Sequence, residues 1–140
     1  NPLEHRLENV GTYNNITYYN DSISTIPAAT INAVKALKNV NTLIIGGMDR
    51  GIHYQPLIDF LNNSDIEHII CMPNTGHTIA KELTNNKAIL VQDLAEAVEK
   101  AKEVTKPNTI CLLSPAAASY GFFINFEERG EKYKELIAKK

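Results

Sequence analysis

Short apolar runs alternate with amphipathic segments along most of this chain. The apolar runs cover residues 42–47, 66–72, 88–91 and 109–115. Each run is too short for a typical helix and is bounded by polar residues, so we expect a strand at each place. Continuous apolar strands separated by helices are typical of a parallel sheet that helices cover on both faces.

Five amphipathic segments predict the helices. They cover residues 27–38, 55–63, 76–86, 93–104 and 125–140. Asp93 and Glu96 have the spacing of a capping pair, and Asn125 is expected to cap the last helix.

Residues 10–21 predict two short strands joined at Asn14-Asn15, which favours a β-hairpin. The predicted fold class is therefore α/β. We expect a Rossmann-like three-layer sandwich, with a mostly parallel sheet, helices on both of its faces and a short N-terminal β-hairpin.

Three polar loops follow predicted strands and would open on one edge of such a sheet, where α/β domains bind ligands. They are residues 20–25 (NDSIST), 46–51 (GGMDRG) and 114–119 (SPAAAS). Each loop also has a purely structural interpretation: helix capping for the first, a tight turn for the second, and close helix packing for the third. From the residues alone, both interpretations stay open.

Composition narrows the class of protein. The chain has 140 residues, 44% apolar and 21% charged, which suits one globular domain. The net charge of −2 and the scattered lysines and arginines do not favour a nucleic-acid partner, and no apolar stretch approaches the roughly 20 residues that cross a membrane. We expect Cys71 and Cys111 to be buried free thiols, and the protein to be cytoplasmic.

Chemical motifs are few. The four histidines show no metal-ligand spacing, no Ser-His-Asp arrangement is legible, and no G-x-x-x-x-G-K-[ST] phosphate loop occurs. The chain opens on Asn1-Pro2 without a methionine, so we expect a processed or excised fragment.

Four longer segments carry more information. They are EHRLE (residues 4–8), YYNDSISTIPAAT (18–30), LIIGGMDRG (43–51) and LLSPAAASYGFFINFEERG (112–130). In this order they resemble the C-terminal domain of the Mur ligases, and the similarity runs from about Leu3 to Gly130. The last segment is typical of the glutamate-adding branch of that family.

The resemblance implies an ATP-dependent ligase of bacterial cell-wall synthesis, and so a link to cell shape and division. In that reaction ATP phosphorylates the carboxylate of UDP-N-acetylmuramoyl-L-alanine, the amino group of glutamate attacks the acyl phosphate, and phosphate leaves. Family members have a domain for the UDP sugar, a central ATPase domain, and a C-terminal lid that binds glutamate. Residues 1–140 resemble only the lid. We therefore expect this chain alone to hold no catalytic residue and no metal and to form no amide bond. ATP and Mg²⁺ are expected as cofactors of the full-length enzyme, and this domain alone is expected to bind neither tightly.

The resemblance also implies roles for particular residues. On the nucleotide side, His5, Arg6, Asp21 and Ser22 would contact ATP, with Arg6 near the phosphates and Asp21 accepting hydrogen bonds from the ribose hydroxyls.

For the incoming glutamate, the implied contacts are Thr25, Arg50, Ser119 and Phe126, and a guanidinium at Arg50 suits a carboxylate. Ile23 departs from the family pattern, which commonly has a lysine there. This departure leaves open whether D-glutamate, L-glutamate or another amino acid is used. The alternatives are the equivalent domain of a folylpolyglutamate synthetase relative, and a non-catalytic nucleotide-binding module.

Overall fold

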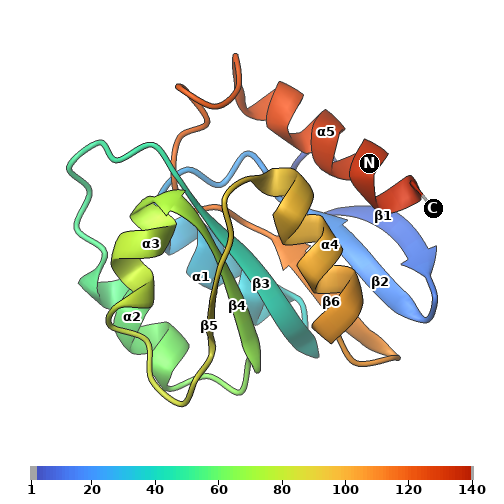
Figure 1. Cartoon of the computed structure of the whole chain (residues 1–140), viewed down its shortest axis with the longest axis horizontal. Coiled ribbons are helices and arrows are strands. Elements are labelled where there is room, and N and C mark those ends of the chain that lie inside the picture. Colours follow the sequence, from blue (N-terminus) through green and yellow to red (C-terminus); the bar gives the residue numbers. More distant parts are fainter. Residues whose placement is uncertain (1–2, 140) are drawn as a thin grey trace.

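In the computed structural model, which describes residues 3–139, six strands form one sheet (Figure 1). The strands are β1 (Glu8–Tyr13), β2 (Ile16–Asn20), β3 (Val40–Gly47), β4 (His68–Asn74), β5 (Ala88–Leu90) and β6 (Thr109–Leu113). Their order across the sheet is β1-β2-β6-β3-β4-β5. β1 and β2 form the antiparallel hairpin, and the other neighbouring pairs are parallel.

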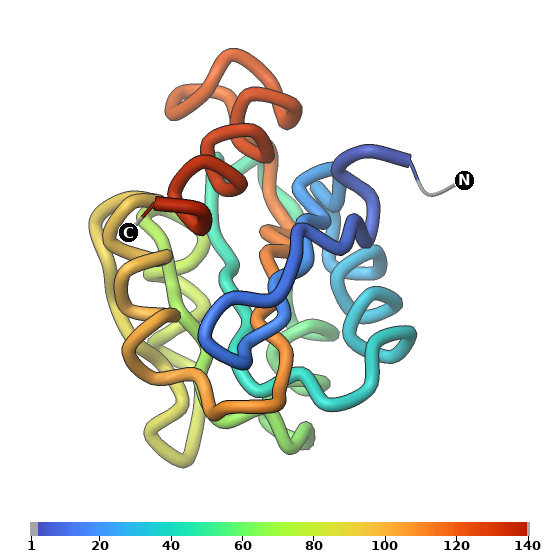
Figure 2. The backbone as a smooth tube through the Cα atoms, turned by 90° about the vertical axis from the view of Figure 1, so that its right-hand side faces the viewer, coloured from blue at the N-terminus to red at the C-terminus, as the bar shows by residue number. Residues whose placement is uncertain are grey.

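The helices cover both faces of the sheet. They are α1 (Pro27–Ala36), α2 (Gln55–Asn62), α3 (Thr75–Ala80), α4 (Leu94–Val104) and α5 (Phe126–Ala138). Side chains of α1, α2 and α3 share one core cluster, and those of α4 and α5 share another. Figure 2 shows α1 and α4 on opposite sides of the strands. The predicted three-layer α/β sandwich is confirmed.

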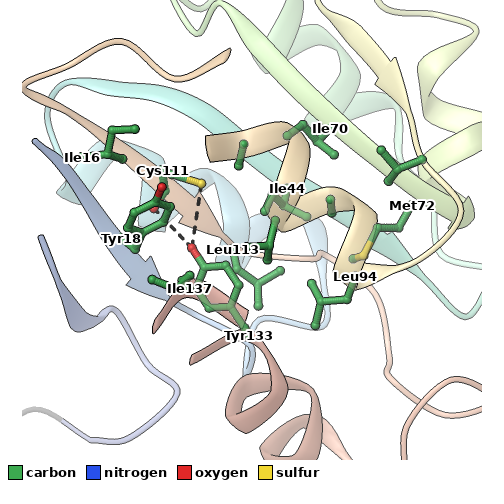
Figure 3. Packing of buried hydrophobic residues seen from close by; sticks show 14 residues of the cluster. Ile16, Tyr18, Ile44, Ile70, Met72, Leu94, Cys111, Leu113, Tyr133 and Ile137 are labelled. Carbon is green, nitrogen blue, oxygen red and sulfur yellow. Dashed lines mark hydrogen bonds between the residues drawn. The ribbon is translucent and has the colours of Figure 1, made fainter. Parts of the chain in front are cut away.

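Successive strand residues alternate between the two clusters, because side chains along a strand point to opposite faces. In β3, Leu43 and Ile45 face α1–α3, whereas Ile44 faces α4 and α5. Figure 3 shows the second cluster, in which the Tyr133 hydroxyl lies 3.5 Å from the Cys111 carbonyl oxygen. Cys71 and Cys111 are buried and free, as the sequence predicted.

The local signals of the sequence are mostly confirmed. Asn14 and Asn15 have φ angles of 51° and 67°, as the tight turn of a two-residue hairpin requires. Asp93 caps α4 by accepting from the Glu96 N–H at 2.8 Å. Asn125 caps α5 in the same way.

One predicted helix is wrong in length. The pattern predicted a helix over residues 76–86, whereas α3 ends at Ala80. The Asn62 side chain binds the Glu82 carbonyl and the Thr84 N–H, both at 2.9 Å, and so takes backbone groups that a longer helix would use itself. Asn85 and Asn86 then adopt left-handed φ angles of 59° and 57°.

Asn1, Pro2 and Lys140 lie outside the described residues. The last helix was predicted to reach Lys140, whereas α5 ends at Ala138 and Lys139 is already extended. Within residues 3–139, no helix combines the length and the apolar character that crossing a membrane requires.

Candidate functional site

The three polar loops predicted at one edge of the sheet lie side by side. They follow β2, β6 and β3, which are neighbours in the sheet. Loop 114–119 lies in the middle: the Ala116 N–H donates to the Ser24 carbonyl at 3.0 Å, and the Met48 N–H donates to the Ala118 carbonyl at 2.9 Å. We call loops 20–25, 46–51 and 114–119 together the rim. The predicted common edge is confirmed.

Asp21 is buried on the β2 side of the rim. Its carboxylate accepts hydrogen bonds from the Leu7 N–H at 3.1 Å, from the Ser114 hydroxyl at 2.7 Å and from the Ser24 hydroxyl. Burial raises the pKa of Asp21, because desolvation disfavours the charged form, while these donors and the nearby Arg6 act in the opposite direction. Asp21 therefore ties the N-terminal segment to two loops.

A capping role for loop 20–25 is wrong. α1 begins after Ile26, which offers no side-chain cap, and Pro27 occupies its first turn, where a missing N–H is tolerated. The short polar side chains of the loop bind one another and neighbouring segments instead.

His5 and Asn20 continue this network beside α5. The Asn20 amide donates to His5 Nδ1 at 2.8 Å and to the Glu8 carboxylate at 3.0 Å. The His5 ring meets the Phe126 ring edge-on, with centroids 6.1 Å apart. A Cβ at Gly130 would collide with the His5 ring, so only glycine lets α5 pack this closely.

Arg129, at the start of α5, holds two of the rim loops together. Its Nε donates to the Ser22 hydroxyl at 2.9 Å, its Nη2 to the Ser22 carbonyl at 2.7 Å and its Nη1 to the Ala117 carbonyl at 3.0 Å. The Ser22 hydroxyl in turn donates to the Phe126 carbonyl at 2.7 Å. Burial lowers the pKa of Arg129 to about 10, so the guanidinium stays charged at neutral pH.

A surface hollow of about 400 Å³ lies at the β2 side of the rim. Arg6, Asp21 and Ile23 are among the residues that line it. Arg6 is exposed, whereas His5 and Ser22 are buried and contact α5: the His5 ring lies against Phe126, and the Ser22 hydroxyl donates to the Phe126 carbonyl. Of the four residues predicted on the nucleotide side, two line the hollow and two pack against α5 instead.

Arg50 and Ser119 lie on the β3 side. Met48 and Ala118 pair across two loops, which brings the segment that carries Arg50 alongside the one that carries Ser119. Arg50 is exposed, and Ser119 is buried. The structure thus places Arg50 and Ser119 on neighbouring loops, one exposed and one buried.

Thr25 and Phe126 lie on the other side of loop 114–119. Thr25 follows Ser24, whose carbonyl binds that loop, and Phe126 lies against His5. Both side chains are half-buried. The four residues predicted for glutamate are therefore divided between the two sides of the rim rather than gathered at one point.

Glu4, His5 and Glu131 are the one group among residues 3–139 whose ligand atoms lie close enough to hold a metal ion. Lys134 already forms ion pairs with Glu4 at 3.2 Å and with Glu131 at 3.0 Å. A resident cation thus neutralises this cluster, and the cluster does not fit a magnesium site.

Sequence reasoning missed Arg129. A signal for it existed: Arg129, Tyr133 and Ile137 recur every four residues and share the buried face of α5. A charged residue on an apolar helix face indicates a buried polar contact. The hydrogen bonds of Asn20 and Ser114 were also missed, because they depend on which strands are neighbours in the sheet.

The fold and the rim define a Rossmann-like domain with cations and hydrogen-bonding loops at the carboxyl edge of a parallel sheet, which is an arrangement suited to anionic ligands. The chain belongs to the Mur ligase, glutamate ligase domain family, whose pattern matches residues 5–117.

Relatives from two kinds of ligase are similar to this chain. A UDP-N-acetylmuramoylalanine–D-glutamate ligase of Oenococcus oeni is 41% identical over 141 residues, which cover 96% of this chain and 31% of the relative. A UDP-N-acetylmuramoyl-L-alanine–L-glutamate ligase of Micromonospora is 37% identical over 139 residues, which cover 96% of this chain and 30% of the relative. The chain thus spans about a third of the length of the relatives that it matches.

The fold also occurs in more distant enzymes. A bifunctional folylpolyglutamate synthase/dihydrofolate synthase of Yersinia pestis, solved with AMPPNP and a manganese ion, has a TM-score of 0.69 at 14% identity. The match covers 96% of this chain and 32% of that one. At this identity the likeness concerns the fold alone.

Proposed function

We propose that this chain is the C-terminal, glutamate-binding lid of an ATP-dependent ligase that joins glutamate to UDP-N-acetylmuramoyl-L-alanine in bacterial cell-wall synthesis. The main support is one edge of the sheet, where the rim loops carry Arg50 and Ser119 and where Arg6, from the N-terminal segment, lies exposed at the hollow on the β2 side. Glutamate and ATP are both anionic, and closure of a lid over both needs cations and donors at such an edge.

ATP would meet the β2 side of the rim. Arg6 is exposed at the hollow and suits the phosphates. A carboxylate has about four lone-pair sites. Asp21 uses three of them inside the protein, which leaves one for a ribose hydroxyl. His5 and Ser22 would support this side of the nucleotide site indirectly, through their contacts with α5. The remainder of the full-length cytoplasmic enzyme would supply the phosphate loop, the Mg²⁺ ligands and the UDP-sugar site.

Glutamate would meet the β3 side of the rim. We assign one carboxylate to Arg50 and the other to the Ser119 hydroxyl, with Thr25 and the backbone near Phe126 at the margin of the site. In the reaction, the glutamate amino group attacks an acyl phosphate on the sugar-linked alanine, an amide bond forms, and phosphate leaves. These residues of the lid would hold glutamate in place and exclude water, and none of them makes or breaks a bond.

The test uses the complete ligase, produced from the full reading frame. Release of ADP is measured with ATP and UDP-N-acetylmuramoyl-L-alanine, and with D-glutamate and L-glutamate supplied separately. Turnover with one of the two enantiomers is expected. The comparison between them is informative, because relatives of both kinds exist and Ile23 replaces a common lysine. Turnover with neither enantiomer would disprove the proposed function.

A further inference from the structure

Residues 47–54 carry Arg50 from β3 to α2, and we call this segment the Arg50 loop. A side chain of α3 holds its start. Thr75 is the first residue of α3 and is 3% exposed. Its hydroxyl oxygen accepts from the Gly47 N–H at 3.0 Å, and the same hydroxyl donates to the Gly47 carbonyl at 3.2 Å. One side chain thus satisfies both backbone groups of the residue with which the loop begins.

The end of the Arg50 loop is held by Tyr54, which directly precedes α2. The Tyr54 hydroxyl donates to the Ala116 carbonyl at 2.8 Å, in the neighbouring loop of the rim. Figure 1 shows the loop leaving the end of β3 and running past α3 to the start of α2. Arg50 therefore lies between two anchored ends, while its own side chain is exposed.

The backbone just before Thr75 has an unusual conformation. Asn74 has a φ of 67° and a ψ of −112°, outside the regions that residues other than glycine commonly adopt. Gly76 packs so closely against β3 that a Cβ would lie 3.1 Å from the Ile45 carbonyl oxygen. Such conformations persist where the surrounding structure holds them, and they are frequent at functional sites. Here the turn brings the Thr75 hydroxyl against Gly47.

Neither hydroxyl serves the helix at whose start it lies. A threonine at this place often caps its own helix, but α3 has no side-chain cap, and Thr75 binds the end of β3 instead. Tyr54 likewise offers no side-chain cap to α2. Both hydroxyls bind loops of the rim, so their contacts act on the place where substrates would be held.

We propose that Thr75 and Tyr54 are positioning residues of the ligase: they fix the two ends of the Arg50 loop, so that the guanidinium is in place before glutamate arrives. This inference rests on the proposed function. An arginine on a loosely held loop loses conformational freedom when it binds a ligand, and anchoring the loop in advance reduces that cost. Thr75 and Tyr54 themselves touch no substrate, because both act through Arg50.

The test measures steady-state kinetics of the complete ligase, with ATP and the enantiomer of glutamate that wild type uses varied in turn. Thr75→Val keeps the shape of the side chain and removes the hydroxyl. It should raise the KM for glutamate roughly fivefold to tenfold, at the upper part of the range for one neutral hydrogen bond, and leave the KM for ATP nearly unchanged. Thr75→Ser keeps the hydroxyl and should restore the wild-type value. Thr78→Val, at an exposed position of α3, is the matched control and should change neither KM.

A double-mutant cycle with Arg50→Ala shows whether Thr75 acts through Arg50. If it does, adding Thr75→Val to Arg50→Ala should cause no further loss in the use of glutamate. Losses that add would overturn the inference, and so would an equal rise of both KM values in Thr75→Val or an unchanged KM for glutamate. If Arg50→Ala alone leaves the use of glutamate unchanged, Thr75 has no contact to position and the inference is overturned as well.

The outcomes separate the two proposals. If wild type uses neither enantiomer of glutamate, the proposed function fails and this inference fails with it, whereas the results named above overturn this inference alone. Melting temperatures record folding in each variant. Should Thr75→Val not fold, Tyr54→Phe replaces it, because it removes only a hydroxyl and keeps the ring. A raised KM for glutamate at an unchanged KM for ATP then supports the inference, and an unchanged KM for glutamate overturns it.

Discussion

The two sides of the rim both carry polar side chains, but those of the β2 side are buried and hydrogen-bonded, whereas those of the β3 side include exposed groups. On the β2 side, His5, Asn20 and Asp21 are at most 4% exposed and bind one another's segments. On the β3 side, Arg50 extends into solvent, and Phe122 and Ile124 are 47% and 73% exposed. The β2 side is a closed hydrogen-bonded network, which we call the frame. On the β3 side, a cation and apolar side chains remain exposed to solvent.

The contrast separates the residues that stabilise the fold from the residues that are free to bind a ligand. Buried polar groups must find partners within the chain, so changes on the β2 side should act first on stability. Exposed groups contribute little to stability, so changes on the β3 side should act on substrates. Substitutions on each side separately test whether stability and substrate use divide in this way.

Gly130→Ala should give the largest loss of stability. Alanine in a helix normally stabilises it relative to glycine, but here the new Cβ would collide with the His5 ring and approach Asn20. We expect the free energy of unfolding to fall by about 3 kcal/mol, at the upper part of the range for overpacking. Urea unfolding of the purified protein measures this change.

Gly51→Ala is the matched control for that substitution. Gly51 has a φ of 74°, but no other group lies within 4 Å of the position that an alanine methyl would take, so only backbone strain is added. The cost should be about 1–2 kcal/mol. A larger loss for Gly51→Ala than for Gly130→Ala would show that the β2 side is not the tighter of the two.

The sequence predicts most of the architecture because its signals are local. Apolar runs, the Asn14-Asn15 turn and the caps at Asp93 and Asn125 each act within a few residues, and each is confirmed. The end of α3 was missed because it depends on Asn62, which binds Thr84 from 22 residues earlier in the chain. A contact of that kind leaves no local pattern.

In the site, too, long-range contacts between side chains could not be predicted. The position of the three loops at one edge follows from the parallel sheet, and it was predicted. The contact between Asp21 and Ser114 spans 93 residues and needs β2 beside β6, which periodicity does not reveal. One partner of Arg129 is equally remote: Ser22 is 107 residues away, whereas Ala117 is 12 residues away.

Arg50→Ala tests the β3 side of the rim. In the complete ligase we expect kcat/KM for glutamate to fall roughly tenfold to a hundredfold, or about 1.5–3 kcal/mol, because a charged hydrogen bond is lost. The KM for ATP and the melting temperature should barely change, since the side chain is exposed. Arg50→Lys should recover part of the loss. Lys81→Ala, which removes an exposed cation outside the rim, is the control. An equal loss for every substrate would contradict a contact with glutamate.

Asp21→Ala tests the β2 side of the rim. It leaves the Leu7 N–H and the Ser24 and Ser114 hydroxyls without their acceptor. We expect the free energy of unfolding to fall by about 2 kcal/mol, within the range for unpaired buried donors. Asp21→Asn keeps an acceptor for Leu7 and can donate to the serines, so it should cost less. If Asp21→Asn nevertheless raises the KM for ATP, the carboxylate also serves the nucleotide. Equal stability of the two variants would contradict the frame.

The smallest expected effect is a dependence of stability on pH. Burial raises the pKa of Asp21, so its protonated form is favoured in the folded state. The resulting stabilisation is fully present below the pKa of Asp in the unfolded chain, about 3.9, and is lost as the pH rises through the folded-state pKa.

Asp21→Asn removes this titrating group and serves as the reference. Glu8, whose pKa is lowered and whose contribution has the opposite sign, is present in both proteins and cancels. The free energy of unfolding of wild type minus that of Asp21→Asn should therefore grow by less than about 1 kcal/mol as the pH falls from about 7 to about 4.5. Urea unfolding of both proteins across this range measures it, and a difference that shrinks on acidification would mean that the hydrogen bonds to Asp21 outweigh its burial.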